Sequence, residues 1–439
     1  MIKEIRLINW KSFKDAIVYI DPLNVLIGTN ASGKSNLIDG IAYLNSAVHG
    51  KNLQFALDGG GGLFPPVGGV RGGSEYAAML PGDQFTLETV IQEDDNTDYR
   101  YSITIRTKPQ VEVITESLTK VIHKKKRPKE INLFNTLKND EKVDNLSPII
   151  PAYINNGQGR TIRKDLKNTI SVISQLNNYE IKNDEVLHAI QYVTDKMEQI
   201  FILDPVPSLM RDYVPFSSYF LENASNLAGM IAALPDDKRL KIENQLTLYL
   251  SKLPEGEITR VWTEPVGKFQ RDAMLYCEEK WGKTCQPIII DTRGMSDGTL
   301  RFLAILTALL TRPEGSLIVI EEVDNGLHPS RATLLLQTIQ EIGANRSIDL
   351  LITTHNPALM DELGAEMIPF IQVVHRDTLD GSSKITLLED IKTLPKLLAR
   401  GSVGELSTRG VIEKSLTLKE GNTTVPGISP YDGGVINEK

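Results

Sequence analysis

Hydrophobic and polar positions alternate through the first part of the chain and predict strands around one glycine-rich loop. Residues 2–8 and 14–20 read as two strands, and the unbroken apolar run 23–27 reads as a short buried strand. Beyond the loop at residues 28–35, apolar residues recur at helical spacing until Gly50. The chain is therefore predicted to begin as strands, a loop and a helix.

The later pattern predicts a second group of buried strands. Alternation at residues 85–113 indicates an antiparallel layer, and residues 148–286 carry mainly helical spacing. Apolar runs at 288–290, 317–320 and 350–353 read as core strands separated by helices. The predicted fold class is α/β, with a mixed or parallel core sheet, an antiparallel β layer and an inserted, mainly helical subdomain.

These changes of pattern predict four segments. Residues 1–106 form an N-terminal lobe with the glycine-rich loop, and residues 107–287 form an inserted β and helical region that acts as a lid or arm. Residues 288–420 form a C-terminal lobe. Residues 421–439, rich in Gly, Pro, Asn and Thr, are expected to be a flexible tail.

The glycine-rich loop carries the clearest chemistry. Its sequence, GTNASGKS, matches the phosphate-binding pattern G-x-x-x-x-G-K-[ST] at every specified position. Small residues allow a tight turn whose backbone N–H groups, with the positive end of the next helix, face a polyphosphate. Lys34 is expected to reach the β- and γ-phosphates, and the Ser35 hydroxyl to hold Mg²⁺. The predicted nucleotide-binding residues here are Gly28, Asn30, Ala31, Ser32, Gly33, Lys34, Ser35 and Asn36.

Polar residues follow the late buried strands. Glu321 and Glu322 come directly after the run 317–320, where they are the expected source of a magnesium-associated acid and of a base for water. His355 follows the run 350–353, where it can hydrogen-bond a γ-phosphate or the attacking water. Glu322, His355 and Lys34 are the predicted catalytic residues, and Ser35 and Glu321 the predicted metal ligands.

A second candidate anion site opens the helix that begins near residue 297. Ser296 and Gly298 lie at its N-terminus, where free N–H groups and the helix dipole favour negative charge. Because one chain rarely needs two γ-phosphate sites, this second site needs a separate explanation.

Composition and charge narrow the class of protein. The 439 residues are 41% hydrophobic and 24% charged, as in ordinary globular proteins. A net charge of −8 argues against a protein covered in basic surface for nucleic acid, but it allows a local basic patch.

The cysteines and the apolar runs bear on the compartment. The spacing of Cys277 and Cys285 fits neither a metal site nor a disulfide framework. No leader precedes the first strand, and no apolar run is long enough to span a bilayer, so we expect a cytoplasmic protein without a membrane partner.

Four further features have open interpretations. Trp10 and Phe13 either cover an adenine ring or pack in the interior. The run 124–127, Lys-Lys-Lys-Arg, is a solvated loop or a contact for nucleic acid or an acidic partner. Arg71, in a long Gly- and Pro-rich loop, is a candidate contact for nucleotide or DNA. Composition does not explain Arg211.

Taken in order, five motifs resemble those of ABC-type ATPases. They are residues 28–35 (Walker A), 295–299 (signature), 317–322 (Walker B), 324–329 (D-loop) and His355 (switch histidine). The Asn-Trp-Lys-Ser-Phe element at residues 9–13 makes the chain most similar to the SMC, RecF and OLD-like group of AAA-family ATPases. The resemblance covers residues 1–106 and 288–415. It implies an ABC-type P-loop ATPase head that hydrolyses ATP with Mg²⁺.

The resemblance also explains the second anion site. In that group two heads meet face to face, and each ATP lies between one Walker A loop and the signature motif of the partner. Ser296 and Gly298 would then contact nucleotide bound to another subunit, in a homodimer or a higher oligomer. The sequence departs from the transporter pattern at Asp297, where transporters have Gly, and at Glu321, where they have Asp. The segment after His355 is too short for the Toprim nuclease domain of OLD-type proteins.

The leading functional prediction is a switch that dimerises with ATP and acts on DNA or on a separate effector protein. A role in antiphage defence is predicted by analogy with similar stand-alone ATPases. One alternative is a nucleotide-gated scaffold that restrains an effector while hydrolysis is slow. Another is a DNA repair ATPase that resembles RecF, whose DNA binding would weaken steeply with salt.

Overall fold

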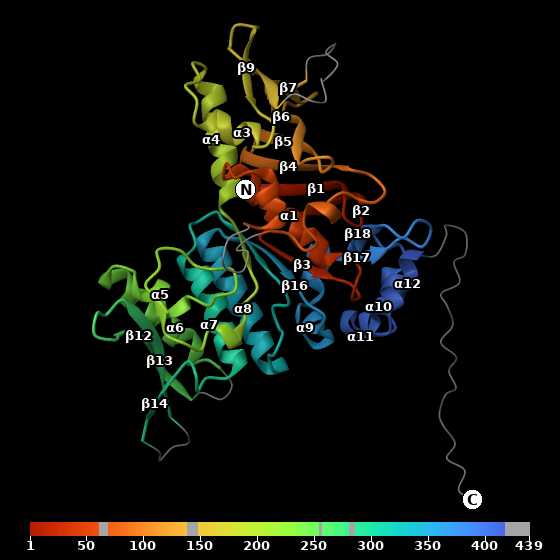
Figure 1. Ribbon diagram of the computed structural model, residues 1–439. Helices are drawn as coiled ribbons and strands as arrows, with labels where there is room; N and C mark the ends of the chain where they lie inside the picture. The colour runs from red at the N-terminus through yellow and green to blue at the C-terminus, as the bar shows by residue number, and fades with distance from the viewer. Residues whose placement is uncertain (61–68, 138–147, 254–256, 281–285, 418–439) are drawn as a thin grey trace, which may run out of the picture.

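The computed structural model describes residues 1–60, 69–137, 148–253, 257–280 and 286–417. In these residues one mixed sheet of fourteen strands extends through the molecule, and a smaller sheet lies apart from it. Figure 1 shows α1 on one side of strands β3 and β16, and α7, α8 and α9 on the other. The arrangement is an α/β fold in three layers.

The parallel half of the large sheet is buried on both faces. Alternate residues of its strands point into two separate cores, so that Val25 lies in one and Leu26 in the other. Burial on both faces explains the unbroken apolar runs. The carboxyl ends of these strands meet at one edge because every neighbouring pair is parallel. In order across the sheet they are β10 (Ile200–Leu203), β15 (Leu317–Ile320), β16 (Asp349–Thr353), β3 (Leu23–Ile27) and β17 (Ile371–Arg376).

The other half of the sheet is antiparallel from β2 onward. Strand β18 joins the halves, because it pairs antiparallel with β17 and parallel with β2 at Ser383 and Phe13. In order the strands are β18 (Ser383–Leu387), β2 (Phe13–Tyr19), β1 (Ile2–Trp10), β4 (Gln84–Asp94), β5 (Thr97–Arg106), β6 (Glu112–Ile122), β7 (Lys129–Asn135), β8 (Ile149–Asn155) and β9 (Thr161–Lys167).

The helices divide between the two cores. One core contains α1 (Lys34–Val48), α2 (Leu53–Asp58), α3 (Val172–Asn177) and α4 (Asp184–Glu198). The other contains α5 (Leu227–Ala232), α6 (Asp236–Leu250), α7 (Asp297–Thr311), α8 (Pro329–Arg346), α9 (Pro357–Glu362), α10 (Leu394–Leu398), α11 (Val403–Thr408) and α12 (Val411–Thr417). Short 3₁₀ helices are η1 (Ser74–Tyr76), η2 (Pro207–Leu209), η3 (Ala365–Phe370) and η4 (Leu388–Asp390).

The smaller sheet packs against the core that contains α7. Its strands are β11 (Val214–Pro215), β12 (Ile258–Val266), β13 (Asp272–Glu279) and β14 (Ile288–Asp291), with β13 paired to each of the others. The run 288–290 was expected to resume the core, but among the strands that the structure describes it pairs, as β14, only with β13, and Ile289 is 60% exposed. Three consecutive apolar residues were therefore not sufficient to identify a core strand.

The middle of the chain holds more strand than its pattern predicts. Helical structure is found in α3 to α6, but the expectation of helices through residues 148–286 is wrong for β8, β9, β10, β12 and β13. Strand β10 pairs with β15, far along the chain, while β8 pairs with β9 and β12 pairs with β13. Strand preference depends more on such neighbours than helix preference does. The division of the chain into four segments stays a prediction.

Candidate nucleotide-binding and catalytic site

The glycine-rich loop joins β3 to α1 at the edge where the parallel strands end. Gly28 and Gly33 have φ values of 148° and 122°. A Cβ at these positions would lie 2.2 Å and 2.4 Å from neighbouring oxygen atoms, so only glycine fits either of them. Lys34 folds back over the loop, where its Nζ donates to the carbonyls of Gly28 at 2.7 Å and Thr29 at 3.1 Å. The loop and its lysine already form a compact cradle.

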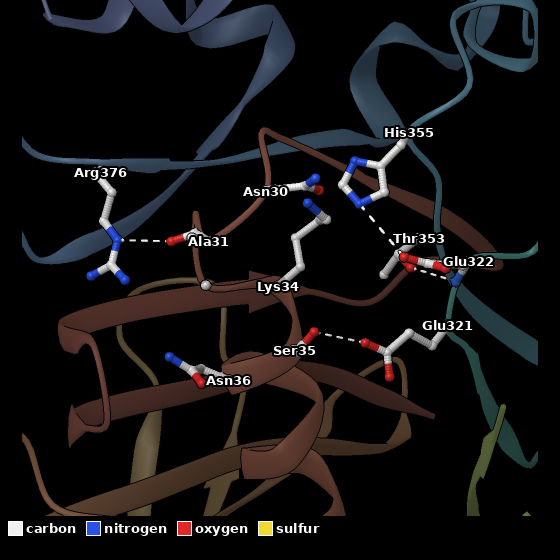
Figure 2. A pocket seen from close by; sticks show the side chains of 11 residues that line it. Asn30, Ala31, Lys34, Ser35, Asn36, Glu321, Glu322, Thr353, His355 and Arg376 are labelled. Carbon is white, nitrogen blue, oxygen red and sulfur yellow. Dashed lines mark hydrogen bonds and ion pairs between the residues drawn. The ribbon is translucent and has the colours of Figure 1, made fainter. Parts of the chain in front are cut away.

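A cavity of about 340 Å³ opens beside this loop (Figure 2). It brings together residues from both ends of the sequence, and most of the predicted site residues line it. Gly28 belongs to the loop itself, and Ser32 is buried within it with 1% exposure. The lining residues are Asn30, Ala31, Gly33, Lys34, Ser35, Asn36, Glu321, Glu322, Thr353, His355 and Arg376.

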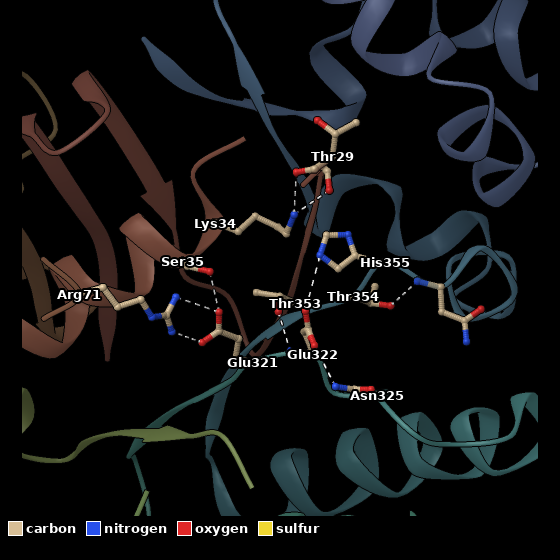
Figure 3. Close-up of polar contacts among 12 residues, drawn as sticks. Thr29, Lys34, Ser35, Arg71, Glu321, Glu322, Asn325, Thr353, Thr354 and His355 are labelled. Atoms are coloured by element: carbon tan, nitrogen blue, oxygen red, sulfur yellow. Dashed lines mark hydrogen bonds and ion pairs between the residues drawn. The ribbon is translucent and has the colours of Figure 1, made fainter. Parts of the chain in front are cut away.

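Glu321 connects the two halves of the site. It follows β15, and its Oε1 accepts a hydrogen bond from Ser35 Oγ at 2.7 Å (Figure 3). Arg71 forms an ion pair with the same carboxylate, with Nη2 2.5 Å from Oε2. The guanidinium offsets a carboxylate that is only 15% exposed and that would otherwise be costly to bury. Arg71, a candidate contact for nucleotide or DNA from its sequence position, thus lies beside the predicted metal ligand Glu321.

Glu322 has a strained backbone. Its φ of 48° lies in the left-handed region, which costs a non-glycine residue about 1–3 kcal/mol. Its N–H donates to Thr353 Oγ1 at 2.8 Å, and its Oε2 accepts from Asn325 Nδ2 at 3.0 Å. The conformation directs the carboxylate into the cavity, toward His355 (Figure 2). Strain held by specific partners is typical of functional positions.

His355 faces the same space from the loop after β16. Its Nε2 lies 4.0 Å from Glu322 Oε1. Burial, and then the nearby charge of Lys34, lower the pKa of His355 below its ordinary value. The imidazole is therefore neutral near pH 7, and it can donate one hydrogen bond and accept another.

The signature residues lie elsewhere. Ser296 caps α7, where its Oγ accepts from Thr299 N at 3.1 Å, and neither Ser296 nor Gly298 lines the cavity. Arg211 braces this turn: its Nη1 donates to the carbonyls of Thr292, Arg293 and Met295, and its Nη2 pairs with Asp297. Arg211, which composition left unexplained, fixes the shape of the second candidate anion site.

The Asn-Trp-Lys-Ser-Phe element supports the loop from behind. Trp10 and Phe13 are both fully buried, so the packed alternative is correct and neither ring is available to cover an adenine. Trp10 Nε1 donates to Asn36 O at 2.7 Å, and the Ser12 hydroxyl accepts from Asn36 Nδ2 at 2.8 Å. The element therefore positions the start of α1.

Thr353 and Arg376 also line the cavity, although neither was among the predicted site residues. Arg376 ends β17, and its Nε donates to the loop carbonyl of Ala31 at 3.0 Å. Thr353 ends β16 and holds the backbone of Glu322. Both stand at carboxyl ends of parallel strands, as the acidic pair and His355 do. Their position at strand ends was the available signal.

Two family models match the chain. A model described as "AAA ATPase domain" matches residues 1–255, which is more than half of the chain. The chain belongs to this family. A second model, described as "AAA domain, putative AbiEii toxin, Type IV TA system", matches residues 289–361 of this AAA ATPase. The predictions of an AAA-family ATPase and of an α/β fold with a mixed core sheet are confirmed, and the protein is an ATPase.

Known proteins give more distant comparisons. An "ATP/GTP phosphatase" of Helicobacter pylori (strain ATCC 700392 / 26695) is 23% identical over 388 residues, which span 83% of this chain and 87% of that protein. An SMC head bound to the C-winged helix domain of ScpA is 12% identical with a TM-score of 0.49, over 88% of this chain and 97% of that one. The SMC head domain from Thermotoga maritima is 13% identical with a TM-score of 0.39, over 88% and 98%.

Magnesium fits the oxygen donors of the site. A hydroxyl and a carboxylate, from Ser35 and Glu321, meet at 2.7 Å beside the phosphate loop. Mg²⁺ is usually held by one or two such protein ligands together with phosphate oxygens and water. Within the described residues, no helix is long and apolar enough to cross a membrane.

Proposed function

We propose that this AAA ATPase binds ATP in the cavity beside the glycine-rich loop and hydrolyses it as a pair of chains that meet face to face. Each ATP would lie between the loop of one chain and Ser296 and Gly298 of the other. One observation carries the proposal: these two residues open a fifteen-residue helix, with Ser296 exposed, yet they lie outside the cavity of their own chain. A helix N-terminus favours an anion, and because this one lies outside the cavity of its own chain, we take the anion to be nucleotide on another chain.

The loop supplies the phosphate contacts. The backbone of residues 28–36 surrounds the phosphates, and Lys34 exchanges the carbonyls of Gly28 and Thr29 for the β- and γ-phosphates. Ser35 and Glu321 would hold Mg²⁺, which neutralises charge on the phosphates when it is bound. When Mg²⁺ binds, Arg71 would either move away from the Glu321 carboxylate or share it with the metal ion. Placing these groups before reaction is the largest part of catalysis in phosphoryl transfer.

Glu322 and His355 act on the water. The Glu322 carboxylate accepts a hydrogen bond from the attacking water and takes its proton as the new P–O bond forms. The bond from the γ-phosphorus to the bridging oxygen breaks in the same reaction, and that oxygen leaves with ADP. Neutral His355 donates to a γ-phosphate oxygen or orients the same water. The 4.0 Å separation of Nε2 and Oε1 allows both side chains to contact the reacting groups. ADP and phosphate are the products.

The switch would act on DNA or on a separate effector protein. Residues 107–287 would serve as the lid or arm that transmits the nucleotide state. Within them Lys124, Lys125, Lys126 and Arg127 are exposed at the turn between β6 and β7, which supports contact with DNA or an acidic partner. One matched family model is described as "AAA domain, putative AbiEii toxin, Type IV TA system", and a place in antiphage defence is proposed by analogy.

The experiment is the molecular mass in solution of the Glu322→Gln protein with and without ATP and Mg²⁺. We expect the mass to double with ATP, because slow hydrolysis preserves the shared nucleotide. Lys34→Ala in the same background should prevent the change. ATP binding without any change of mass, with or without DNA, would overturn the proposed pair.

A further inference from the structure

The backbone of Glu322 is held from two sides. Its N–H is fixed by Thr353 Oγ1, and its carbonyl accepts from Arg301 Nη1 at 3.3 Å. The residue has a φ of 48°, so the turn depends on outside contacts to keep a conformation that glutamate rarely adopts. The direction of the carboxylate follows from this backbone. Both contacts therefore govern where the candidate base lies in the cavity.

Arg301 belongs to the signature helix. It lies in α7, little more than one turn beyond Ser296, and it is 6% exposed. Its second amino group, Nη2, donates to Pro205 O at 3.0 Å, in the segment that follows β10. One guanidinium thus joins three elements: the helix that begins with Ser296, the turn at Glu322 and the segment after β10.

We propose that Arg301 is a positioning residue that holds Glu322 in its reactive orientation and makes this orientation depend on the position of α7. The inference rests on the proposed function, because it takes Glu322 as the base and Ser296 as a contact to nucleotide on the partner. In a pair of chains, one helix then serves two sites. Its first turn touches the partner's ATP, and its Arg301 controls hydrolysis of the ATP on its own chain.

The burial of α7 supports this coupling. Its residues from Gly298 to Leu310 are all buried, and its apolar residues from Leu300 to Leu310 pack in one core, so we expect the helix to shift as a rigid unit. A displacement of Ser296 when the chains engage therefore moves Arg301 as well. Lysine cannot replace the arginine here, because its single ammonium does not present the rigid fork that reaches two carbonyls at once.

The first test is Arg301→Lys. We expect kcat to fall by on the order of 10–100-fold, the effect of misplacing a catalytic group slightly, with KM and the Kd for ATP unchanged. Thr353→Val removes the hydrogen bond that Thr353 Oγ1 accepts from the Glu322 N–H. It should likewise lower kcat and leave KM and the Kd for ATP unchanged. Arg346→Lys is the matched control, because Arg346 donates to the carbonyls of Leu309 and Arg312 at the far end of α7. It should lower the melting temperature without changing kcat.

Mixed pairs separate the two sites. A Lys34→Ala chain is expected to bind ATP on the order of 100-fold more weakly. At ATP concentrations that fill only the other chain, it therefore contributes only its signature motif to a mixed pair. With Arg301→Lys on the other, nucleotide-binding chain, the rate should fall as in the uniform variant. With Arg301→Lys on the Lys34→Ala chain itself, the rate should match that of the unsubstituted mixed pair.

An unchanged kcat in Arg301→Lys, or an equal loss from both placements, would overturn the assignment of Arg301. The proposed function fails in a different way. Normal turnover by Glu322→Gln would remove the base itself, whatever Arg301→Lys does.

Discussion

Glu322→Gln should lower the turnover number for ATP by on the order of 10²–10⁴-fold, the usual contribution of a general base. Glutamine has nearly the same shape as glutamate. Its side-chain oxygen can still accept a hydrogen bond from Asn325, and its backbone N–H can still donate to Thr353. It cannot accept the proton of the attacking water. The loss should therefore appear in kcat, while the Kd for ATP stays within about twofold. Steady-state phosphate release and titration with a fluorescent ATP analogue measure the two quantities.

Glu389→Gln provides the control, since Glu389 is an exposed carboxylate in η4. Its turnover should equal that of the unsubstituted protein. If Glu322→Gln retained more than about a tenth of normal turnover, Glu322 would not be the base.

Lys34→Ala should weaken ATP binding by on the order of 100-fold, because hydrogen bonds from a charged group are worth about 1.5–3 kcal/mol. The substitution removes the ammonium that would contact the phosphates, and it frees the carbonyls of Gly28 and Thr29 that Nζ now holds. Turnover should be lost even at saturating ATP, since Lys34 is expected to stabilise charge on the transferred phosphoryl group. Equilibrium titration and phosphate release report both effects.

Lys238→Ala tests whether removing any positive charge has this effect. Lys238 is exposed on α6, and its removal should leave the Kd unchanged. A Kd for Lys34→Ala within about twofold of normal would contradict the placement of the triphosphate beside this loop.

The features predicted from sequence were those specified locally. The glycine-rich loop is defined by eight consecutive residues, and its place between strand and helix follows from the adjoining pattern. Glu321, Glu322 and His355 could be placed near it because each follows a buried strand, and parallel strands end at a common edge. The prediction needed only the order of the elements.

The missed contacts join distant parts of the chain through long side chains. Arg71 pairs with Glu321, 250 positions away, from a loop whose course no local pattern fixes. Arg211 reaches the signature turn, and Arg301 reaches the segment after β10, in the same way. The sequence around a long polar side chain does not indicate which distant residue it contacts. The roles of these arginines could therefore be assigned only from the structure.

The central claim is that one triphosphate joins two copies of this chain. Thr29→Cys in one tagged copy and Asp297→Cys in a differently tagged copy, both carrying Cys277→Ala, Cys285→Ala and Glu322→Gln, allow a direct measurement with a short bifunctional crosslinker. We predict crosslinks between the two tags when ATP and Mg²⁺ are present, and none without nucleotide. ATP binding with no crosslink between the tags in any nucleotide state would contradict the account.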